Sequence, residues 1–410
     1  MALTREIPKL VVVEREHSLP LDHADPDGRR ITVFTRELAD PDRRDKPLLV
    51  FLQGGPGFEA PRPVRTGSSP AWLDRALVDF RVLMLDQRGT GRSTPVGTRL
   101  PGTPQEQAEY LTHFRADSIV ADCEAIRREL GVERWSVLGQ SFGGFCAMHY
   151  LSAAPDGLRE VLFTGGVPPL EAHIDEVYRT TLQRMRKRSE RFYERYPDDR
   201  ERMLGLLDRA ARDPIELPSG DPLTPERVRQ LGHVLGMSGG FEQLHYLLEL
   251  PPDSPAFGRD AELITSFSRN PIYAVLQEAC WANGGATEWS AQRMLDEQVD
   301  WPEDCLTAEH VLPSMFEAPT LAPLREAADL LAEHEWPTLY DLDRLRANAV
   351  PAAAVVYAED IYVERRFSER TAAEVPKLSV WLTNEYDHDG LRADAERVLG
   401  RLIDLVRGRL

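Results

Sequence analysis

Trp135-Ser-Val-Leu-Gly-Gln-Ser-Phe-Gly-Gly-Phe145 is the stretch of sequence that decides the fold. It contains the pattern G-x-S-x-G, in which a buried strand turns sharply into a helix at Ser141. The helix can pass close to the strand only if the residues two before and two after the serine are small, and these are Gly139 and Gly143. The turn also leaves the first backbone N–H groups of the helix beside the serine oxygen, where they favour negative charge. Ser141 is therefore the candidate nucleophile.

The segments around this turn have the order that the motif requires. Residues 117–130 carry apolar side chains at helical spacing, and residues 136–138 continue as a short buried strand. Residues 145–151 form a largely apolar helical pattern, and residues 161–164 predict the next strand. A chain with 28 glycines offers many chances for the bare pattern, but chance does not explain this order of helix, strand, turn, helix and strand.

Composition indicates a soluble globular protein. Its 410 residues exceed one ordinary domain, and a content of 42% hydrophobic and 28% charged residues suits a large buried core. The excess of 67 acidic over 49 basic residues argues against a nucleic-acid partner. No apolar run approaches the roughly 18 residues of a membrane span, and the first ten residues lack a signal-peptide core. The four cysteines lie far apart, which favours reduced cytoplasmic thiols over a zinc site or disulfides.

The rest of the chain predicts an α/β sheet interrupted by a helical insertion. Buried strand patterns occur at 9–21, 29–37, 47–52, 80–86, 352–357 and 378–383. The first two are expected to form an N-terminal hairpin on an otherwise mostly parallel sheet. The region from about residue 170 to 340, which precedes the last two strands, has long helical patterns and no strand-like runs. We therefore expect a first core part at 1–169, a helical cap at 170–340 and a second core part at 341–410.

A glycine cluster, Gln53-Gly-Gly-Pro-Gly57, follows the strand at 47–52, at the end where open α/β sheets place their sites. A serine at such a turn uses one backbone N–H from the residue after it and one from a loop after an earlier strand. We expect the oxyanion donors to be the N–H groups of Phe142 and Gly55, with Gly54 as the alternative to Gly55. Asp86 and Arg88 follow the next strand, and we expect an ion pair that braces the loops rather than a catalytic role.

The serine also needs a histidine base and a carboxylate that orients it, and at this kind of turn both follow the serine in the chain. His310 and His334 fall inside the helical insertion, whereas His388 follows the last strand directly. His388 is therefore the expected base. Asp360 lies just beyond the strand at 352–357 and is the expected acid. Its neighbour Glu359 is the competitor, because adjacent side chains on an extended segment point to opposite sides and only one can reach the imidazole.

Four motifs together make the chain resemble the proline iminopeptidases (prolyl aminopeptidases), most closely the larger actinobacterial-type members. They are Gln53-Gly-Gly-Pro-Gly57, Asp86-Gln-Arg-Gly-Thr-Gly-Arg-Ser93, Gly139-Gln-Ser-Phe-Gly-Gly144, and the late Asp360 with His388. The resemblance implies an α/β-hydrolase fold with an α-helical cap, and removal of N-terminal proline by a triad of Ser141, Asp360 and His388. The first position of the glycine loop departs from the family, since it is Gln53 where a histidine is usual.

The resemblance also implies that cap glutamates recognise the free α-amine of the substrate. A carboxylate at the site favours a cationic terminus over a blocked one. Glu278 and Glu242 are the candidates because they lie in apolar helical surroundings, and Glu317 is a weaker third.

Two other classes of function fit the same motifs. One is a different hydrolase on this scaffold, such as a broader aminopeptidase, an amidase or an esterase, because specificity depends on the cap. The other is a non-catalytic ligand-binding protein, against which the complete set of three residues argues. We expect a small peptide substrate and no metal or organic cofactor. The sequence leaves the oligomeric state open.

Overall fold

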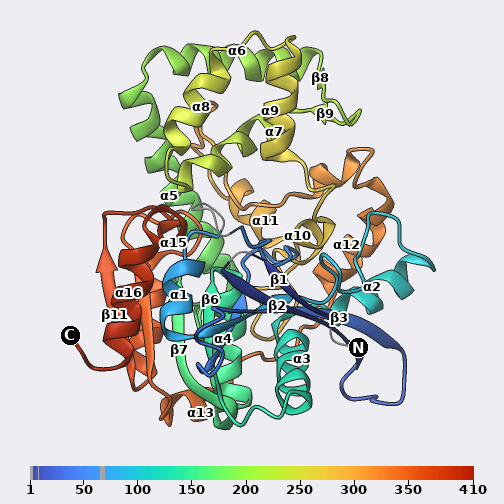
Figure 1. The fold of residues 1–410 in the computed structure, drawn as a ribbon. Coiled ribbons are helices and arrows are strands. Elements are labelled where there is room, and N and C mark those ends of the chain that lie inside the picture. The colour runs from blue at the N-terminus through green and yellow to red at the C-terminus, as the bar shows by residue number, and fades with distance from the viewer. Residues whose placement is uncertain (1–2, 8, 65–69) are drawn as a thin grey trace.

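One large sheet organises the computed structural model, which describes residues 3–7, 9–64 and 70–410 (Figure 1). The strand order is β1-β2-β3-β5-β4-β6-β7-β10-β11. The strands are β1 (Leu3–Ile7), β2 (Leu10–Pro20), β3 (Arg30–Ala39), β4 (Leu48–Leu52), β5 (Arg81–Asp86), β6 (Trp135–Gln140), β7 (Leu158–Thr164), β10 (Ala352–Tyr357) and β11 (Leu378–Thr383). The pairs β1/β2, β2/β3 and β3/β5 are antiparallel, and the pairs from β5 to β11 are parallel. The α/β class is therefore confirmed, with β1 as an edge strand that the sequence did not signal.

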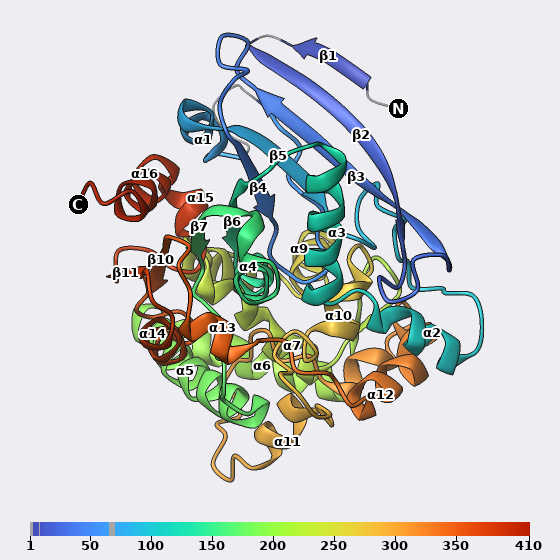
Figure 2. The same cartoon turned by 90° about the horizontal axis from the view of Figure 1, so that it is seen from below.

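Helices cover both faces of the sheet. Side chains alternate between the two faces along each strand, and on the central strands both sets are apolar and need to be buried. On β4, Leu49 and Phe51 pack toward one face, with α1 (Leu73–Asp79) and α16 (Ala395–Val406). The alternate residues of β4 pack toward the other face, with α3 (Ala116–Glu129) and α4 (Phe142–Ala153), as Figure 2 shows. Each fully buried Leu or Phe contributes about 1.5–3 kcal/mol, so this double burial fixes the middle of the sheet. Outside the segment between β7 and β10, the other helices are α2 (Pro104–Thr112), α14 (Arg365–Glu374) and α15 (Gly390–Ala393).

The chain between β7 and β10 forms the helical insertion. Helices α6 to α9 lie together at the top of Figure 1, beyond one end of the sheet. The helices of the insertion are α5 (Ile174–Arg195), α6 (Asp198–Arg212), α7 (Pro225–Gln230), α8 (Gly240–Leu248), α9 (Pro255–Thr265), α10 (Pro271–Leu276), α11 (Ser290–Asp296) and α12 (Arg325–Glu333). After the expected end of the cap, α13 (Leu342–Arg346) lies against α4. The insertion also contains a small ribbon of β8 (Ile215–Glu216) and β9 (Pro222–Leu223), which corrects the expectation of no strands. Strands of two residues are too short to leave a periodic pattern.

Candidate active site

Ser141 occupies the turn between β6 and α4 with φ 54° and ψ −122°, a backbone conformation that residues other than glycine rarely adopt. Two glycines make the turn possible. A Cβ atom on Gly139 would lie 2.4 Å from the carbonyl oxygen of Gly143, and one on Gly143 would lie 1.9 Å from that of Leu52. Neither position has room for a side chain. The strained turn holds the serine at the end of the sheet, in the cavity described below.

Two loops at the same end of the sheet bring a histidine and an aspartate together. Nδ1 of His388 lies 2.7 Å from Oδ2 of Asp360, and both side chains are buried. The other oxygen of Asp360 accepts the N–H groups of Tyr362, at 2.8 Å, and Val363, at 3.1 Å. Because a carboxylate only accepts hydrogen bonds, Nδ1 carries the proton and Nε2 remains an acceptor. Glu359 does not compete, since it is half-exposed and pairs with Arg191 at 2.7 Å.

Gly165, just after β7, lies between the turn of Ser141 and the ring of His388. A Cβ atom there would lie 3.2 Å from the backbone nitrogen of Ser141 and 3.3 Å from Nε2 of His388. Gly165 has φ +78°, which favours glycine in addition to the lack of space. Nε2 of the imidazole and the backbone of the serine turn therefore both lie against Gly165.

The surroundings of His388 set the charge that it can carry. Burial by itself would lower the pKa of His388, but the nearby charge and hydrogen bond of Asp360 outweigh burial and raise the pKa above its ordinary value. A second histidine, His233, lines the same cavity. Burial lowers the pKa of His233 to about 4, and the charge of His388 adds to this effect. One histidine is thus able to take up a proton, while the other stays neutral.

The glycine loop after β4 lies against the serine turn. A Cβ atom on Gly54 would lie 3.0 Å from Cβ of Ser141, whereas the atoms nearest to one on Gly55 belong to Gly57 and Phe58. Gly55 and Gly54 both line the cavity that holds Ser141. The loop is held from below by Gln87, whose Nε2 donates to the carbonyl oxygen of Gln53 at 3.0 Å. Which glycine donates to an oxyanion together with Phe142 stays a prediction.

A cavity of about 420 Å³ opens in front of these groups. Ser141, His388 and the glycine loop form part of its lining, and the cap contributes His233, Met237, Tyr273 and Glu309. A second chamber of about 550 Å³ shares four of these lining residues, namely Phe58, His233, Tyr273 and Glu309. The two cavities therefore adjoin, and Glu309 is the one carboxylate among the residues that they share.

Glu309 is the acidic group that the sequence analysis missed. Its Oε1 accepts the hydroxyl of Tyr273 at 2.7 Å, and its Oε2 accepts Nε2 of Gln277 at 3.3 Å. Burial raises the pKa of Glu309, although the charge of His388 and the bond from Tyr273 act against this rise. The local signal was a single acid in the apolar run Leu306-Thr-Ala-Glu-His-Val-Leu312, in an insertion that contains many other acids.

The structure does not bring the predicted cap glutamates to this cavity. Glu242, on α8, is half-exposed and pairs with Arg195. Glu278 is buried, as its apolar neighbours indicated, but its oxygens accept the N–H groups of Ser290, at 3.2 Å, and Ala291, at 2.8 Å, at the start of α11. Burial raises the pKa of Glu278 to about 7. Glu317, the weaker candidate, is exposed near Arg325.

The expected ion pair between Asp86 and Arg88 is also corrected. Asp86 pairs with Arg62, with Oδ1 to Nη1 at 2.9 Å. Arg88 pairs instead with the buried Asp122 of α3, with Nη2 to Oδ1 at 2.6 Å. Both arginine contacts brace loops, as expected, but Asp86 and Arg88 have separate partners instead of pairing with each other.

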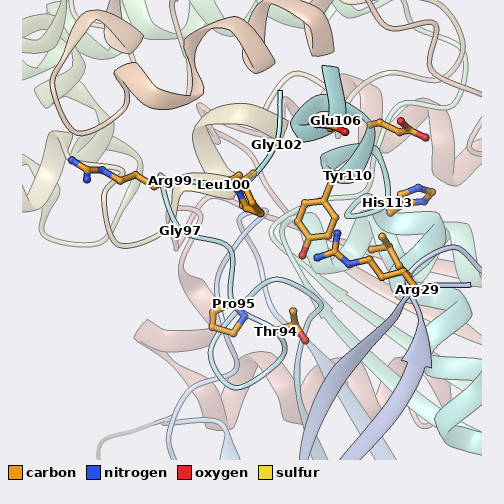
Figure 3. Close-up of a pocket in the computed structure, with 13 residues that line it drawn as sticks. Arg29, Thr94, Pro95, Gly97, Arg99, Leu100, Gly102, Glu106, Tyr110 and His113 are labelled. Atoms are coloured by element: carbon orange, nitrogen blue, oxygen red, sulfur yellow. The ribbon is translucent and has the colours of Figure 1, made fainter. Parts of the chain in front are cut away.

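A larger cavity, of about 620 Å³, lies elsewhere on the molecule (Figure 3). It lies between the β2–β3 connection, the loop at 94–102 and α2, where Arg29 stacks over the ring of Tyr110 at 4.4 Å. None of its lining residues belongs to the serine, histidine or glycine-loop groups. Volume alone therefore does not identify the reactive site, and the chemistry of the lining does.

Comparison with known proteins identifies the family of the chain. Over 407 residues, the chain is 46% identical to proline iminopeptidase from Aeromonas sobria, an alignment that covers 95% of each chain. The chain belongs to the proline iminopeptidase family. A second proline iminopeptidase, aneH from Aspergillus aculeatus, is 32% identical over 424 residues, covering 97% of this chain and 94% of that protein.

Residues 47–211 of this proline iminopeptidase family member match the family described as alpha/beta hydrolase fold. The solved structure of esterase E22 has a TM-score of 0.50 and 12% identity, over 96% of this chain and 100% of that one, and shows a common fold only. The expected α/β-hydrolase fold is thereby confirmed.

Two further features are absent from the residues that the structure describes. No helix among them has the length and apolar character to cross a membrane. In the same part of the chain, no group of three or more His, Cys, Asp or Glu side chains is arranged to hold a metal ion.

Proposed function

We propose that this protein is a serine aminopeptidase that releases N-terminal proline from peptides, with Ser141, His388 and Asp360 as its triad. One observation carries the proposal: Ser141, His388 and the carboxylate of Glu309 line the same cavity. A nucleophile with its base at one wall and an anion at another suits a substrate whose cationic terminus lies close to the scissile bond. Residues 1–169 and 341–410 form the catalytic core in this proposal, and 170–340 form the cap.

In the first half of the reaction, Oγ of Ser141 attacks the carbonyl carbon of the N-terminal proline. Nε2 of His388 takes the hydroxyl proton, and Asp360 stabilises the resulting imidazolium through Nδ1. The N–H groups of Phe142 and of Gly55 hold the oxyanion, with Gly54 as the alternative to Gly55. Each such donor is worth about 10²–10³-fold in rate. When the tetrahedral intermediate collapses, the C–N bond breaks and His388 gives its proton to the departing amine.

In the second half, a water molecule replaces the released peptide. His388 takes a proton from this water while its oxygen attacks the prolyl ester of Ser141. The ester bond then breaks, the proton returns to Oγ of Ser141, and free proline leaves. The balance needs only water, so the cycle requires no cofactor.

Recognition of the free terminus is assigned to Glu309, in place of Glu242 and Glu278. The α-amine of a peptide is largely protonated at neutral pH. A carboxylate that is already oriented by Tyr273 and Gln277 keeps further lone pairs for the two N–H groups of a protonated prolyl nitrogen. An acylated nitrogen would bring neither the charge nor those donors, and it would leave the carboxylate desolvated and unpaired.

The test compares three substrates: Pro-p-nitroanilide, N-acetyl-Pro-p-nitroanilide and p-nitrophenyl acetate. For the wild type, we expect acetylation to lower kcat/KM at least about 100-fold. Glu309→Gln keeps the shape but removes the charge, and we expect kcat/KM for Pro-p-nitroanilide to fall by about 10–100-fold. The same variant should hydrolyse p-nitrophenyl acetate within about twofold of wild type, because this ester has no amine.

Glu242→Gln is the matched control, since it removes the same charge from a cap glutamate outside the cavity. It should leave all three substrates unchanged. Equal turnover of free and acetylated substrates would contradict aminopeptidase specificity. Failure of the wild type to react with a fluorophosphonate probe would contradict the serine mechanism itself and favour a binding role.

A cytoplasmic location is part of the same proposal. Cys123, Cys146, Cys280 and Cys305 are free and buried. Free thiols in the protein interior suit a reducing compartment. Non-reducing mass mapping of the protein from its native host would contradict this location if it found these cysteines in disulfides.

A further inference from the structure

A turn of the cap is hydrogen-bonded to the loop that carries the histidine. This segment, residues 231–238, follows α7 and will be called the cap turn. The backbone N–H of His388 donates to the carbonyl oxygen of Gly236 at 3.0 Å. The next residue, Asp389, accepts both the backbone N–H and the hydroxyl of Ser238, at 2.9 and 2.7 Å. The main chain of the histidine is thus held by the cap and not only by the sheet.

Tyr362 connects the same cap turn to the aspartate and to the imidazole. Its backbone N–H donates to Oδ1 of Asp360 at 2.8 Å. Its ring lies edge-on to the ring of His388, with centroids 4.8 Å apart at an angle of 76°. Its hydroxyl donates to the backbone carbonyl of His233 in the cap turn. Tyr362 therefore contacts the acid through its backbone, and the base and the cap through its buried side chain.

The fit between Tyr362 and the cap turn leaves no free space. A Cβ atom on Gly236 would lie 2.4 Å from the Cε2 and Cζ atoms of the Tyr362 ring. Arg188 of α5 closes the arrangement from outside, because it donates to the carbonyl of Leu235 at 2.8 Å and to Asp387 at 2.6 Å. Movement of the cap turn would therefore displace Tyr362, the residue that packs on the imidazole.

The imidazole needs this second support. The hydrogen bond to Asp360 holds Nδ1 at one point, and the ring can still tilt about that point. An edge-on aromatic neighbour restricts this tilt and so fixes the direction of Nε2. A misplacement of about 1 Å at a reacting group can cost about 10²-fold in rate.

We infer that Tyr362, anchored by the cap turn, is a positioning residue for His388. It directs Nε2 of the imidazole toward Ser141 while the same cap turn presents the ring of His233 to the substrate cavity. The cap thereby acts on the chemical step as well as on substrate selection. The inference rests on the proposed triad, but it does not depend on the choice of proline as substrate.

The experiment measures the rate of modification of Ser141 by a fluorophosphonate, because this rate reports nucleophile activation without any prolyl group. Tyr362→Phe retains the ring and removes the anchor to His233. We expect this variant to be labelled about tenfold more slowly per folded molecule, and kcat for Pro-p-nitroanilide to fall by the same factor with KM within about twofold. A purely structural role would lower the melting temperature and leave both rates unchanged well below it.

Gly236→Ala provides a second, independent variant, because its methyl group would push against the Tyr362 ring. We expect slower labelling here too. The matched controls are Tyr386→Phe and Gly205→Ala. The hydroxyl of Tyr386 bonds to Asp394, away from the imidazole, and a Cβ atom added at Gly205 would meet no atom within 4 Å. Both controls should react at the wild-type rate.

Wild-type labelling in folded Tyr362→Phe and Gly236→Ala would overturn the inference, as would a loss confined to KM. If Tyr362→Phe does not fold, the labelling rate of Gly236→Ala decides alone. If the wild type is labelled but does not hydrolyse prolyl substrates, the aminopeptidase proposal fails and the labelling comparison still tests Tyr362. If the wild type is not labelled, the triad fails, and the inference with it.

Discussion

The serine turn and the cap carboxylate line the same cavity, but they are specified by the sequence in different ways. Gly139, Ser141 and Gly143 lie within five residues, and the backbone geometry of that turn dictates all three. Glu309 is placed by contacts with Tyr273 and Gln277, which lie 36 and 32 residues earlier in the chain. Local strain demands particular residues at a turn, whereas a pocket in a helical insertion can draw its polar groups from any of several helices.

The difference separates reactivity from selectivity. In the proposed mechanism, the core groups, together with the cap turn that supports them, determine whether an acyl transfer can occur, and Glu309 determines which acyl group reaches them. Variants of the core triad should therefore abolish reaction with every substrate, while a Glu309 variant should discriminate between substrates.

Ser141→Ala should remove turnover of amide and ester substrates alike. The variant lacks the nucleophile, and we expect kcat to fall by about 10⁶-fold for Pro-p-nitroanilide. Fluorophosphonate labelling should disappear in mass spectra of the intact protein. Labelling that persists in this variant would place the reactive serine elsewhere and separate the turn from the chemistry.

Asp360→Asn should have the next largest effect. An amide at this position can donate to Nδ1 and stabilise the wrong tautomer, so we expect kcat to fall by about 10⁴-fold with little change in KM. Glu359→Gln is the matched control, because its carboxylate pairs with Arg191 outside the site. The pair of variants would contradict the assignment if Glu359→Gln were the more damaging one.

These two regions also show how far the sequence alone could lead. The turn, His388 and Asp360 were predictable because parallel strands end at one edge, so residues that follow β6, β10 and β11 must gather there. The cap glutamates were not. Glu278 and Glu309 both lie in apolar surroundings, and only the packing of the insertion decides that one meets the start of α11 and the other the cavity. Short elements such as β8 and β9 escaped for a related reason, since two residues carry no periodicity.

The pH dependence of kcat/KM should report the charge of the core. In the proposed mechanism neutral His388 accepts the serine proton, and the pKa of His388 is raised because the charge of Asp360 outweighs the opposing effect of burial. Activity is therefore lost as the pH falls through a value above 6.5, by about tenfold per pH unit. Glu309 and Asp389 add to the rise, whereas His233, with a pKa of about 4, stays neutral over this range.

The measurement uses p-nitrophenyl acetate, so that ionisation of the substrate amine and its contact with Glu309 do not contribute. Asp360→Asn should move the midpoint of the acid limb to lower pH, because it removes the charge that raises the pKa. A wild-type midpoint at or below 6.5 would mean that burial outweighs the charge of Asp360.

The smallest effect on activity, and the sharpest contrast with Glu309, is expected for Glu278→Gln. The pKa of Glu278 is raised by burial from 4.5 to about 7, so the native state holds a proton between these values that the unfolded chain has released. Stability therefore falls as the pH rises from about 4.5 to 7, by on the order of 3 kcal/mol from this group. The glutamine variant does not titrate, and its one carbonyl oxygen remains an acceptor for one of the two N–H groups, those of Ser290 and Ala291. Urea unfolding at pH 5 and pH 7 should show that the free energy of unfolding decreases less for Glu278→Gln than for the wild type or Glu242→Gln. The value of kcat/KM should stay unchanged.

A loss of prolyl turnover in Glu278→Gln at either pH would mean that this buried carboxylate also acts on the substrate, and the division between a structural and a recognising glutamate would fail.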